Sequence, residues 1–370
     1  MISLVALSLL ATSQLIAALP QQGPVLEAPL TAANIKAPGG KLTKLRYGPL
    51  AIPAMGMLEN KDIRNITKPC SDCYITAYEA GLEDEAGKSV NTNDGAWLHH
   101  IVMYQAGSGE RDLVCPLQPA KRTFASGNER TPIRVSADGK YGIKVGATSR
   151  FSLLYDVVNE SDKPVSYYIT ITYEYSSDTS IKPADVIYLD VTGNCGIAYV
   201  PARDGNFTLT NSPGYASDIS GKLLSATGHG HDGVTTVNVK LGGKAICESA
   251  QLYAGRPGYT SKPMDNMPGM PGMHDMHDMP AAPSSAPSGE TTGMTGGMAA
   301  GSSSSPPTLK SEASVKHISD TGVCMDFGTF KEGDMFEIDA VYDTKKNGLN
   351  KAMGQFVDLM GISLVYVAPA

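Results

Sequence analysis

The chain carries short runs of alternating or β-branched residues that are separated by clusters of Gly, Pro, Asn and Asp. Alternation with a period of two is typical of strands, and Gly, Pro, Asn and Asp favour the turns between them. The runs that predict strands are 97–105, 151–158, 165–175, 186–191, 222–228, 235–241, 335–343 and 361–367. None of these runs leads into an amphipathic pattern long enough for a helix of several turns. The sequence therefore predicts an all-β fold of antiparallel, jelly-roll-like sandwiches.

The length of 370 residues favours about two domains. The Gly- and Pro-containing stretch 192–215 is the best place for a crossover, so we expect a first β-sandwich domain over 19–191 and a second over 192–370. The second domain is interrupted by a Met-, Pro-, Gly- and Ser-rich insert over 262–312. That insert has almost no aliphatic or aromatic residue that could form a core, which predicts disorder.

Residues 1–18 form an apolar stretch that ends in small residues, which is typical of a secretory signal peptide. Polar residues interrupt the stretch and leave it too short for a membrane span, and no later run is long enough. Sequons begin at Asn65, Asn159 and Asn206, and each could carry a glycan on a surface turn. We therefore expect a secreted, extracellular glycoprotein with no membrane span.

Charge and cysteine content narrow the function further. Lys and Arg total 30 against 37 for Asp and Glu, so there is no basic excess for binding nucleic acid. Six cysteines in an oxidising compartment predict up to three disulfide bonds. Proximity in the chain favours a bond from Cys115 to Cys70 or Cys73, and another from Cys247 to Cys324.

Seven histidines are present, and six lie in three tight clusters. The first cluster is the adjacent pair His99 and His100, inside a strongly β-like run. Because neighbouring residues on an ideal strand point to opposite faces, a shared metal would require a twisted or bulged strand. The alternative is one buried histidine with a hydrogen-bond partner and one at the surface.

The second cluster is His229 and His231, in the run GHGHDG. Residues two apart on a strand face the same way, so both imidazoles would lie together, and the glycines leave room for an ion. This spacing predicts a metal site in which Asp232 orients one imidazole. A glycine-rich turn with two exposed histidines is the alternative.

The third cluster lies in the predicted insert, where methionines recur at every third position with histidines between them. Thioethers favour Cu(I) and imidazoles suit both copper oxidation states, so this segment predicts weak, exchangeable copper binding. A repeat-expanded linker is the alternative. The residues concerned are Met264, Met267, Met270, Met273, His274, Met276, His277 and Met279.

In their order along the chain, the His-His pair, the His-x-His pair and the late Met360 resemble the secreted, ascorbate-dependent copper type II monooxygenases. That family includes peptidylglycine hydroxylating and dopamine β-monooxygenase. The chain resembles the plant and fungal stress up-regulated nodule-protein group more closely still. That second resemblance rests on GHGHDG, the segments 246–247 and 322–324, AVYD at 340–343 and the terminal MGI, and the covered region is about 45–368 apart from the insert.

The resemblance implies two copper sites and an oxidative reaction. His99 and His100 would contribute to an electron-transfer copper, and His229, His231 and Met360 would hold the oxygen-activating copper. Dioxygen would be the co-substrate and ascorbate a possible reductant, with hydroxylation of a substrate C–H bond as the outcome. The sequence leaves the substrate, small molecule or peptide, and the oligomeric state open.

One departure affects the first copper. The family takes a third histidine from a strand between the two motifs, and this chain has no histidine between His100 and His229. The corresponding run here is 151–158, where Asp156 or Val157 stands near the expected position. Asp156, or a thioether from Met55, Met57 or Met103, could complete a weaker site.

Two functions therefore compete. Retention of His-x-His and Met360 favours a copper monooxygenase, whereas loss of the third histidine favours non-catalytic extracellular copper capture or storage, or a stress-related role. Zinc is the weaker choice of metal because it would leave the Met360 thioether without a role. The sequence contains neither a G-x-S-x-G elbow nor a GxxxxGK[ST] phosphate loop, so those catalytic templates do not apply.

Overall fold

The computed structural model describes residues 25–193, 195, 200–211, 213–261, 314–352 and 355–370. The described residues up to Ser261 and from Lys316 onward belong to one compact unit. The predicted signal peptide and the predicted Met- and His-rich copper-binding insert lie outside the described residues.

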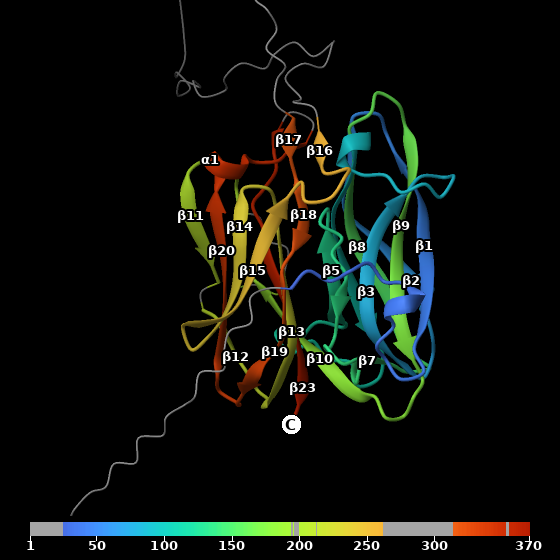
Figure 1. Ribbon diagram of the computed structural model, residues 1–370, viewed down its shortest axis with the longest axis vertical. Coiled ribbons are helices and arrows are strands. Elements are labelled where there is room, and N and C mark those ends of the chain that lie inside the picture. The colour runs from blue at the N-terminus through green and yellow to red at the C-terminus, as the bar shows by residue number, and fades with distance from the viewer. Residues whose placement is uncertain (1–24, 194, 196–199, 212, 262–313, 353–354) are drawn as a thin grey trace, which may run out of the picture. The chain divides into compact units, whose positions relative to one another are not determined.

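The described chain is almost entirely strand, as Figure 1 shows, which confirms the all-β prediction. Three short helices occur among the described residues: η1 (Ala32–Asn34), η2 (Thr92–Asp94) and α1 (Thr344–Asn347). The strands of the first half are β1 (Lys41–Ile52), β2 (Gly56–Ile66), β3 (Cys73–Glu83), β4 (Ala96–Ala106), β5 (Lys121–Gly127), β6 (Ile133–Arg134), β7 (Tyr141–Val145), β8 (Arg150–Asn159), β9 (Val165–Ser176) and β10 (Lys182–Asp190).

The strands of the second half belong partly to the sheet of β1 and β10 and partly to sheets of their own. They are β11 (Asn206–Thr210), β12 (Tyr215–Ala216), β13 (Gly221–Gly230), β14 (Val234–Leu241), β15 (Lys244–Tyr253), β16 (Thr260–Ser261), β17 (Val315–Lys316), β18 (Ile318–Thr321), β19 (Val323–Phe330), β20 (Met335–Asp343), β21 (Lys351–Ala352), β22 (Gln355–Phe356) and β23 (Gly361–Pro369). All eight predicted runs are strands, namely β4, β8, β9, β10, β13, β14, β20 and β23.

Strand β2 is an example of a strand that the hydropathy pattern missed. Its middle carries the polar run Glu59 to Asp62, and its pairing with β8 is broken by two register shifts. Asn60 and Asn65 adopt positive φ angles of 50° and 53° at these irregularities. Each irregularity disturbs the alternation of faces, so a period-two pattern is lost.

Three large sheets build the fold. A nine-stranded sheet runs in the order β1-β9-β3-β7-β10-β23-β13-β19, with β6 beside β3. A four-stranded sheet, β2-β8-β4-β5, and a six-stranded sheet, β11-β20-β14-β15-β18 with β12 beside β20, accompany it. The long sheet is common to both halves of the chain, because β10 pairs in antiparallel register with β23 from Asp185↔Val367 to Asp190↔Ile362.

Two hydrophobic cores accompany these sheets. The first gathers residues of the β1-to-β10 half, such as Tyr78 and Phe124, whose rings stack with centroids 4.8 Å apart. The second gathers residues of the C-terminal half, such as Phe336 and Val365. Strand β23 contributes to both cores, because Leu364 and Tyr366 belong to the first and Val365 to the second. The two cores agree with a two-sandwich architecture, while the domain boundary at 191/192 stays a prediction.

The disulfide bonds partly follow the prediction. Cys247 pairs with Cys324 as expected, whereas Cys115 pairs with Cys195, and Cys70 pairs with Cys73. The prediction for Cys115 was wrong because proximity in the chain ignores the fold. The loop after β4 lies beside the segment that follows β10, as the contact between the Gln118 amide and the Cys195 carbonyl shows.

The structure also contradicts one of the three predicted glycosylation sites. The amide nitrogen of Asn159 donates to the carbonyls of Pro53 and Lys163, and the residue is fully buried. A glycan on Asn159 is therefore incompatible with this fold. Asn65 and Asn206 are exposed.

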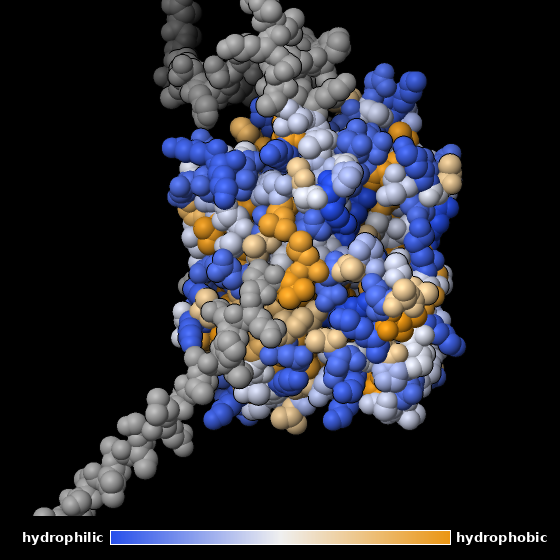
Figure 2. Space-filling view, in the orientation of Figure 1, coloured by the Kyte–Doolittle hydropathy of each residue, from blue (hydrophilic) through white to orange (hydrophobic). Residues whose placement is uncertain are grey.

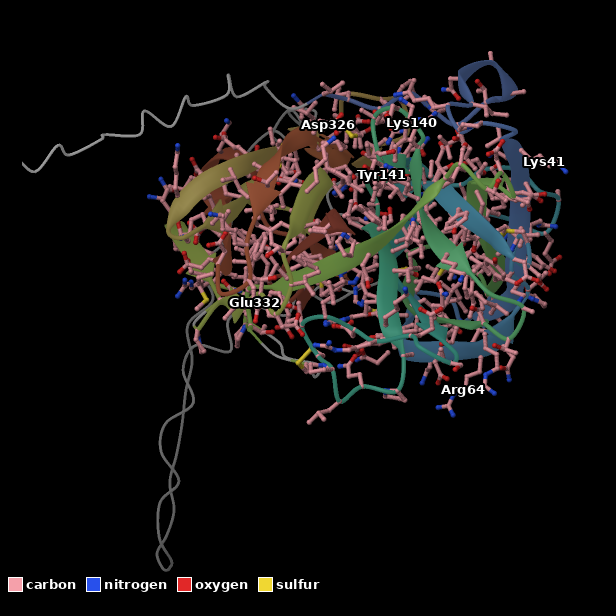
Figure 3. All side chains as sticks on the ribbon, turned by 90° about the horizontal axis from the view of Figure 1, so that it is seen from below. Lys41, Arg64, Lys140, Tyr141, Asp326 and Glu332 are labelled. Atoms are coloured by element: carbon pink, nitrogen blue, oxygen red, sulfur yellow. A yellow bond between two sulfur atoms is a disulfide. The ribbon has the colours of Figure 1, made fainter. Side chains whose placement is uncertain are left out.

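Hydrophilic residues cover much of the face in Figure 2, and Figure 3 shows Lys41 and Arg64 extending at the outer rim.

Candidate metal centre

The His-His pair lies on β4, in the four-stranded sheet. Both side chains are buried, with His99 5% and His100 8% exposed. The pairing of β4 with β8 shifts register between Leu98 and His100. This bulge turns both imidazoles toward each other, with their Nδ1 atoms 3.3 Å apart. The strand distortion that a shared metal would require is therefore present.

The His-x-His pair lies at the end of β13, in the nine-stranded sheet. His229 and His231 are both buried, and their ring centroids are 5.7 Å apart. A neighbouring glycine makes room for one ring, because a Cβ on Gly127 of β5 would lie 2.4 Å from His229 Cε1. No larger residue fits at this position without moving the imidazole.

The fold brings the two motifs together. One side-chain nitrogen from each of His99, His100 and His231 lies within 4.8 Å of the others. The rings of His99 and His231 have centroids only 4.2 Å apart. The third imidazole beside the His-His pair therefore comes from the His-x-His motif, rather than from the strand between the motifs. The assignment of two separate coppers to these motifs stays a prediction.

Three ring nitrogens of this cluster are buried without a hydrogen-bond partner, namely Nε2 of His99, His229 and His231. Buried polar atoms are almost always partnered, because leaving them unpaired is costly. Neutral imidazole nitrogens are good ligands for copper and zinc. The donor set and its missing partners therefore fit a bound metal ion.

Hydrogen bonds to the opposite ring nitrogens orient two of these imidazoles. Nδ1 of His229 lies 3.1 Å from each carboxylate oxygen of Glu129, and Nδ1 of His231 lies 2.5 Å from the carbonyl oxygen of Asp358. When Nδ1 carries the proton and donates it, Nε2 keeps its lone pair for a metal. Burial alone would raise the pKa of Glu129, but the His229 imidazole lowers it below the ordinary value.

Asp156 supplies the negative charge beside the His-His pair. Its Oδ2 lies 3.8 Å from His99 Nδ1 and 3.7 Å from His100 Nε2, and the Asn60 N–H donates to its Oδ1 at 2.6 Å. Burial acts to raise the pKa of Asp156, but these partners bring it below the ordinary value. Of the predicted additional ligands, Asp156 thus lies close to the pair, whereas Met103 is fully buried in the first core.

Burial lowers the pKa of His100 and of His231, so these two imidazoles are uncharged at neutral pH. Burial lowers the pKa of His100 to about 3, although Asp156 partly opposes this shift. Burial also lowers the pKa of His231 far below its usual range, and the adjacent His99 and His229 add to the effect. Neutral imidazoles are the ligating form, so a metal ion meets little competition from protons here.

A second buried cluster involves the seventh histidine, which the sequence analysis did not single out. His317 Nδ1 lies 2.6 Å from Asp232 Oδ2, and the Ser261 hydroxyl lies 2.7 Å from His317 Nε2. The N–H of Ile318 donates to the other Asp232 oxygen. The prediction that Asp232 orients His229 or His231 was wrong, because its carboxylate binds the imidazole of His317 instead. An isolated histidine with no neighbouring motif gives no signal in the sequence.

Met360 lies just before β23, next to the histidine cluster. Its backbone is fixed by Tyr342, whose hydroxyl donates to the Met360 carbonyl at 2.6 Å and accepts from the Met360 N–H at 3.1 Å. The half-buried Met360 and His100 line the same hollow of about 430 Å³. Its predicted role as a copper ligand stays a prediction, since that role needs a contact with the metal itself.

A centre of buried imidazoles with unpartnered nitrogens on an all-β scaffold is consistent with a copper-oxygenase-like protein. The comparisons with known proteins support that class. Over 224 residues the chain is 30% identical to the probable copper-dependent oxygenase M1 of Phoma sp. (strain ATCC 20986 / MF5453), which covers 58% of this chain and 57% of the relative. Over 184 residues it is 29% identical to the probable copper-dependent oxygenase clz3 of Cochliobolus lunatus, with 48% of this chain and 59% of the relative covered.

The chain is therefore similar to proteins named probable copper-dependent oxygenases, and it spans less than two thirds of the length of these relatives. No protein-family model matches it. Among solved structures, it is similar to PNGF-II, with a TM-score of 0.39 and 7% identity over 88% of this chain and 65% of the other. It is also similar to N-glycanase F, with a TM-score of 0.37 and 8% identity over 89% and 96%. These TM-scores are too low to support a conclusion.

Proposed function

We propose that the protein is a copper-dependent oxygenase that uses dioxygen to oxidise an organic substrate. The observation that carries this proposal is the convergence of His99, His100 and His231, with partnerless buried nitrogens on His99 and His231. The relationship to two proteins named probable copper-dependent oxygenases supports copper as the metal.

In this proposal His99, His100 and His231 hold the copper, and the adjacent His229, whose Nε2 also has no hydrogen-bond partner, joins them as a ligand. Bound copper would supply the redox chemistry that activates dioxygen toward a C–H bond. Glu129 and the Asp358 carbonyl hold the imidazole tautomers that expose Nε2. Asp156 provides a buried negative charge that offsets the positive charge of a metal.

The finer features belong to the same proposal. Ascorbate is the reductant that we expect, and Met360, which lines the hollow beside His100, is a soft ligand suited to the reduced metal. We also propose that the protein is secreted, with glycans at Asn65 or Asn206. Among the described residues no helix has the length and hydropathy of a membrane span.

The alternative is extracellular copper capture or storage without turnover. Its support is the Met- and His-rich composition of 262–312, which suits several loosely held copper ions. The two functions differ in where copper binds most tightly. An oxygenase keeps copper in the folded centre, whereas a storage protein holds it chiefly in the insert.

Copper analysis with three proteins tests the proposal. Copper content and electron paramagnetic resonance spectra are measured for the full chain, for a His99→Ala/His231→Ala double variant, and for a chain with 262–312 replaced by a short Gly-Ser linker. We expect tightly bound copper in the full chain and the linker protein, and its loss from the double variant. Ascorbate-driven oxygen consumption should follow the same pattern. Copper that disappears with the insert alone would instead establish the storage function.

A further inference from the structure

The hollow that His100 and Met360 share is formed by strands of both halves. Its volume is about 430 Å³, which is within the usual range for sites that bind small molecules. His100, Val102 and Tyr104 alternate along β4 and therefore face the hollow from the same side. Leu154 of β8, Tyr188 of β10 and Ile362 of β23 line it as well. A ligand bound here would lie directly beside the proposed copper centre.

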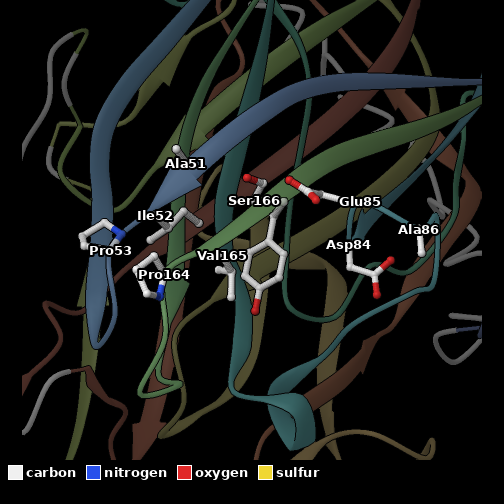
Figure 4. A pocket seen from close by; sticks show the side chains of 10 residues that line it. Ala51, Ile52, Pro53, Asp84, Glu85, Ala86, Pro164, Val165 and Ser166 are labelled. Atoms are coloured by element: carbon white, nitrogen blue, oxygen red, sulfur yellow. The ribbon is translucent and has the colours of Figure 1, made fainter.

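A second hollow of about 730 Å³ lies elsewhere, beside the ends of β1 and β9. Figure 4 shows it between Pro53, Pro164 and the carboxylate-bearing residues Asp84 and Glu85. None of the described histidines lines it. Of these two hollows, the one at His100 is therefore in position to hold a substrate of the centre.

Arg122, the positively charged residue in the wall of the His100 hollow, already has a negatively charged partner. The Arg122 guanidinium binds Asp112 through two hydrogen bonds, from Nε at 2.7 Å and from a terminal nitrogen at 2.8 Å. Both residues are buried, and Arg122 also lies over the Tyr188 ring at 4.1 Å. A bidentate partner leaves this guanidinium poorly placed to pair with a carboxylate on a ligand.

The acid in the wall also has partners of its own. The N–H and hydroxyl of Thr192 donate to Asp190 Oδ1 at 2.9 and 2.8 Å, so this carboxylate is already hydrogen-bonded within the protein. The remaining lining is largely apolar or uncharged, and it includes Val102, Leu154, Ile362 and the hydroxyl-bearing Tyr104. A charged ligand would lose its hydration in this hollow, where Arg122 and Asp190 are already engaged by partners within the protein.

From these features we infer that the hollow binds an uncharged, predominantly apolar small molecule with a hydroxyl or carbonyl group, and presents it to the centre at His100. The Tyr104 hydroxyl is the group that would pair with that polar function. This inference rests on the proposed copper oxygenase for its purpose, because the bound molecule would be the substrate.

Three probes of the same carbon skeleton and different charge test the inference. Binding of 2-naphthamide, 2-naphthoate and 2-naphthylmethylammonium to the metal-free and copper-loaded full chain is measured by isothermal titration calorimetry. We expect the neutral amide to bind at least about tenfold more tightly than either ion, because burial of an unpaired charge is costly. Equal or tighter binding of an ion, or no binding of any probe at millimolar concentration, would overturn the inference.

A matched pair of variants locates the binding site. Leu154→Trp fills the hollow from a half-buried position and should weaken amide binding about tenfold or more. Leu45→Trp changes another half-buried leucine, on β1, which does not line the hollow, and should leave binding unchanged. If the two variants bind the amide equally well, the site lies elsewhere and the inference is wrong.

Removing the neutralising partner should change the charge preference. Asp112→Asn leaves the Arg122 charge unpaired, so 2-naphthoate should gain affinity relative to the amide. Near-ultraviolet circular dichroism checks that the Asp112→Asn variant is folded. If that variant does not fold, the inference is tested by the Leu154→Trp variant alone. Copper content is measured on every sample. If the full chain binds the amide but holds no copper, only the oxygenase proposal is refuted. If the full chain holds copper but Leu154→Trp does not weaken amide binding, only this inference is refuted.

Discussion

Two buried histidine clusters meet at consecutive residues of the chain, since His231 belongs to one and Asp232 to the other. In the first cluster, Nε2 of His99, His229 and His231 has no partner. In the second, both ring nitrogens of His317 are hydrogen-bonded, one to Asp232 and one to Ser261. Both clusters are buried to a similar degree, with His231 5% and His317 3% exposed.

The contrast shows that burial alone does not distinguish a metal ligand from a structural histidine. A histidine whose two nitrogens are satisfied already has its hydrogen-bonding potential met and stabilises the fold. A histidine that is oriented through Nδ1 and has a bare Nε2 is prepared for a ligand that the protein alone does not supply. The predictions that follow test this distinction, from the largest effect to the smallest.

The largest difference is expected in metal content. His231→Ala removes a ligand from the centre and should abolish tightly bound copper, as measured by mass spectrometry of dialysed protein. His317→Ala removes an equally buried imidazole from the partnered cluster and should leave copper content unchanged. Equal loss of copper in both variants would remove the distinction between the clusters.

The second effect concerns stability. His317→Phe leaves the buried Asp232 carboxylate without its imidazole partner, which should lower the free energy of unfolding by roughly 3 kcal/mol. Urea denaturation of the metal-free protein measures the change. The double variant His317→Phe/Asp232→Leu removes the unpaired carboxylate as well, so it should recover part of the loss. A single variant as stable as the parent would show that the hydrogen bond contributes little.

A smaller effect is expected at the carboxylate that orients His229. Glu129→Gln keeps the size of the side chain but weakens its hydrogen bond to Nδ1. Loss of such an orienting partner typically lowers metal affinity about 10- to 100-fold. Competition with a chelator of known affinity should show this weakening while copper still binds at saturating concentration. Unchanged affinity would place His229 outside the metal centre.

Within the first pH unit below 6.5, the pH dependence of the metal-free protein gives the smallest effect. Because the pKa of His100 is lowered from 6.5 to about 3, the unfolded chain takes up a proton between these values that the folded protein does not. Stability contributed by the neutral imidazole is therefore complete above pH 6.5 and declines as the pH falls toward 3, by about 1.4 kcal/mol per pH unit.

Other groups titrate in the same range, so the measurement is a difference. Urea unfolding at several pH values is compared between the parent and His100→Leu. The variant should show the shallower loss of stability as the pH falls from 6.5. Parallel curves would mean that His100 takes up its proton in the folded protein as readily as in the unfolded chain.

The sequence by itself determined the all-β class, because the period of two survives wherever a strand has one face on a core. The run 335–343 has the bounds of β20, and 151–158 lies within β8. It also singled out both histidine motifs, since His-His and His-x-His are local patterns. The polar, bulged strand β2 was missed because its irregular register removes the periodic signal.

Only the tertiary structure decided which histidines share a centre. His100 and His231 are 131 positions apart, and their approach depends on β4 and β13 belonging to different sheets that pack together. The Cys115–Cys195 bond and the Asp232–His317 pair likewise join distant segments. Such contacts depend on the packing of whole sheets, so neither spacing nor composition along the chain specifies them.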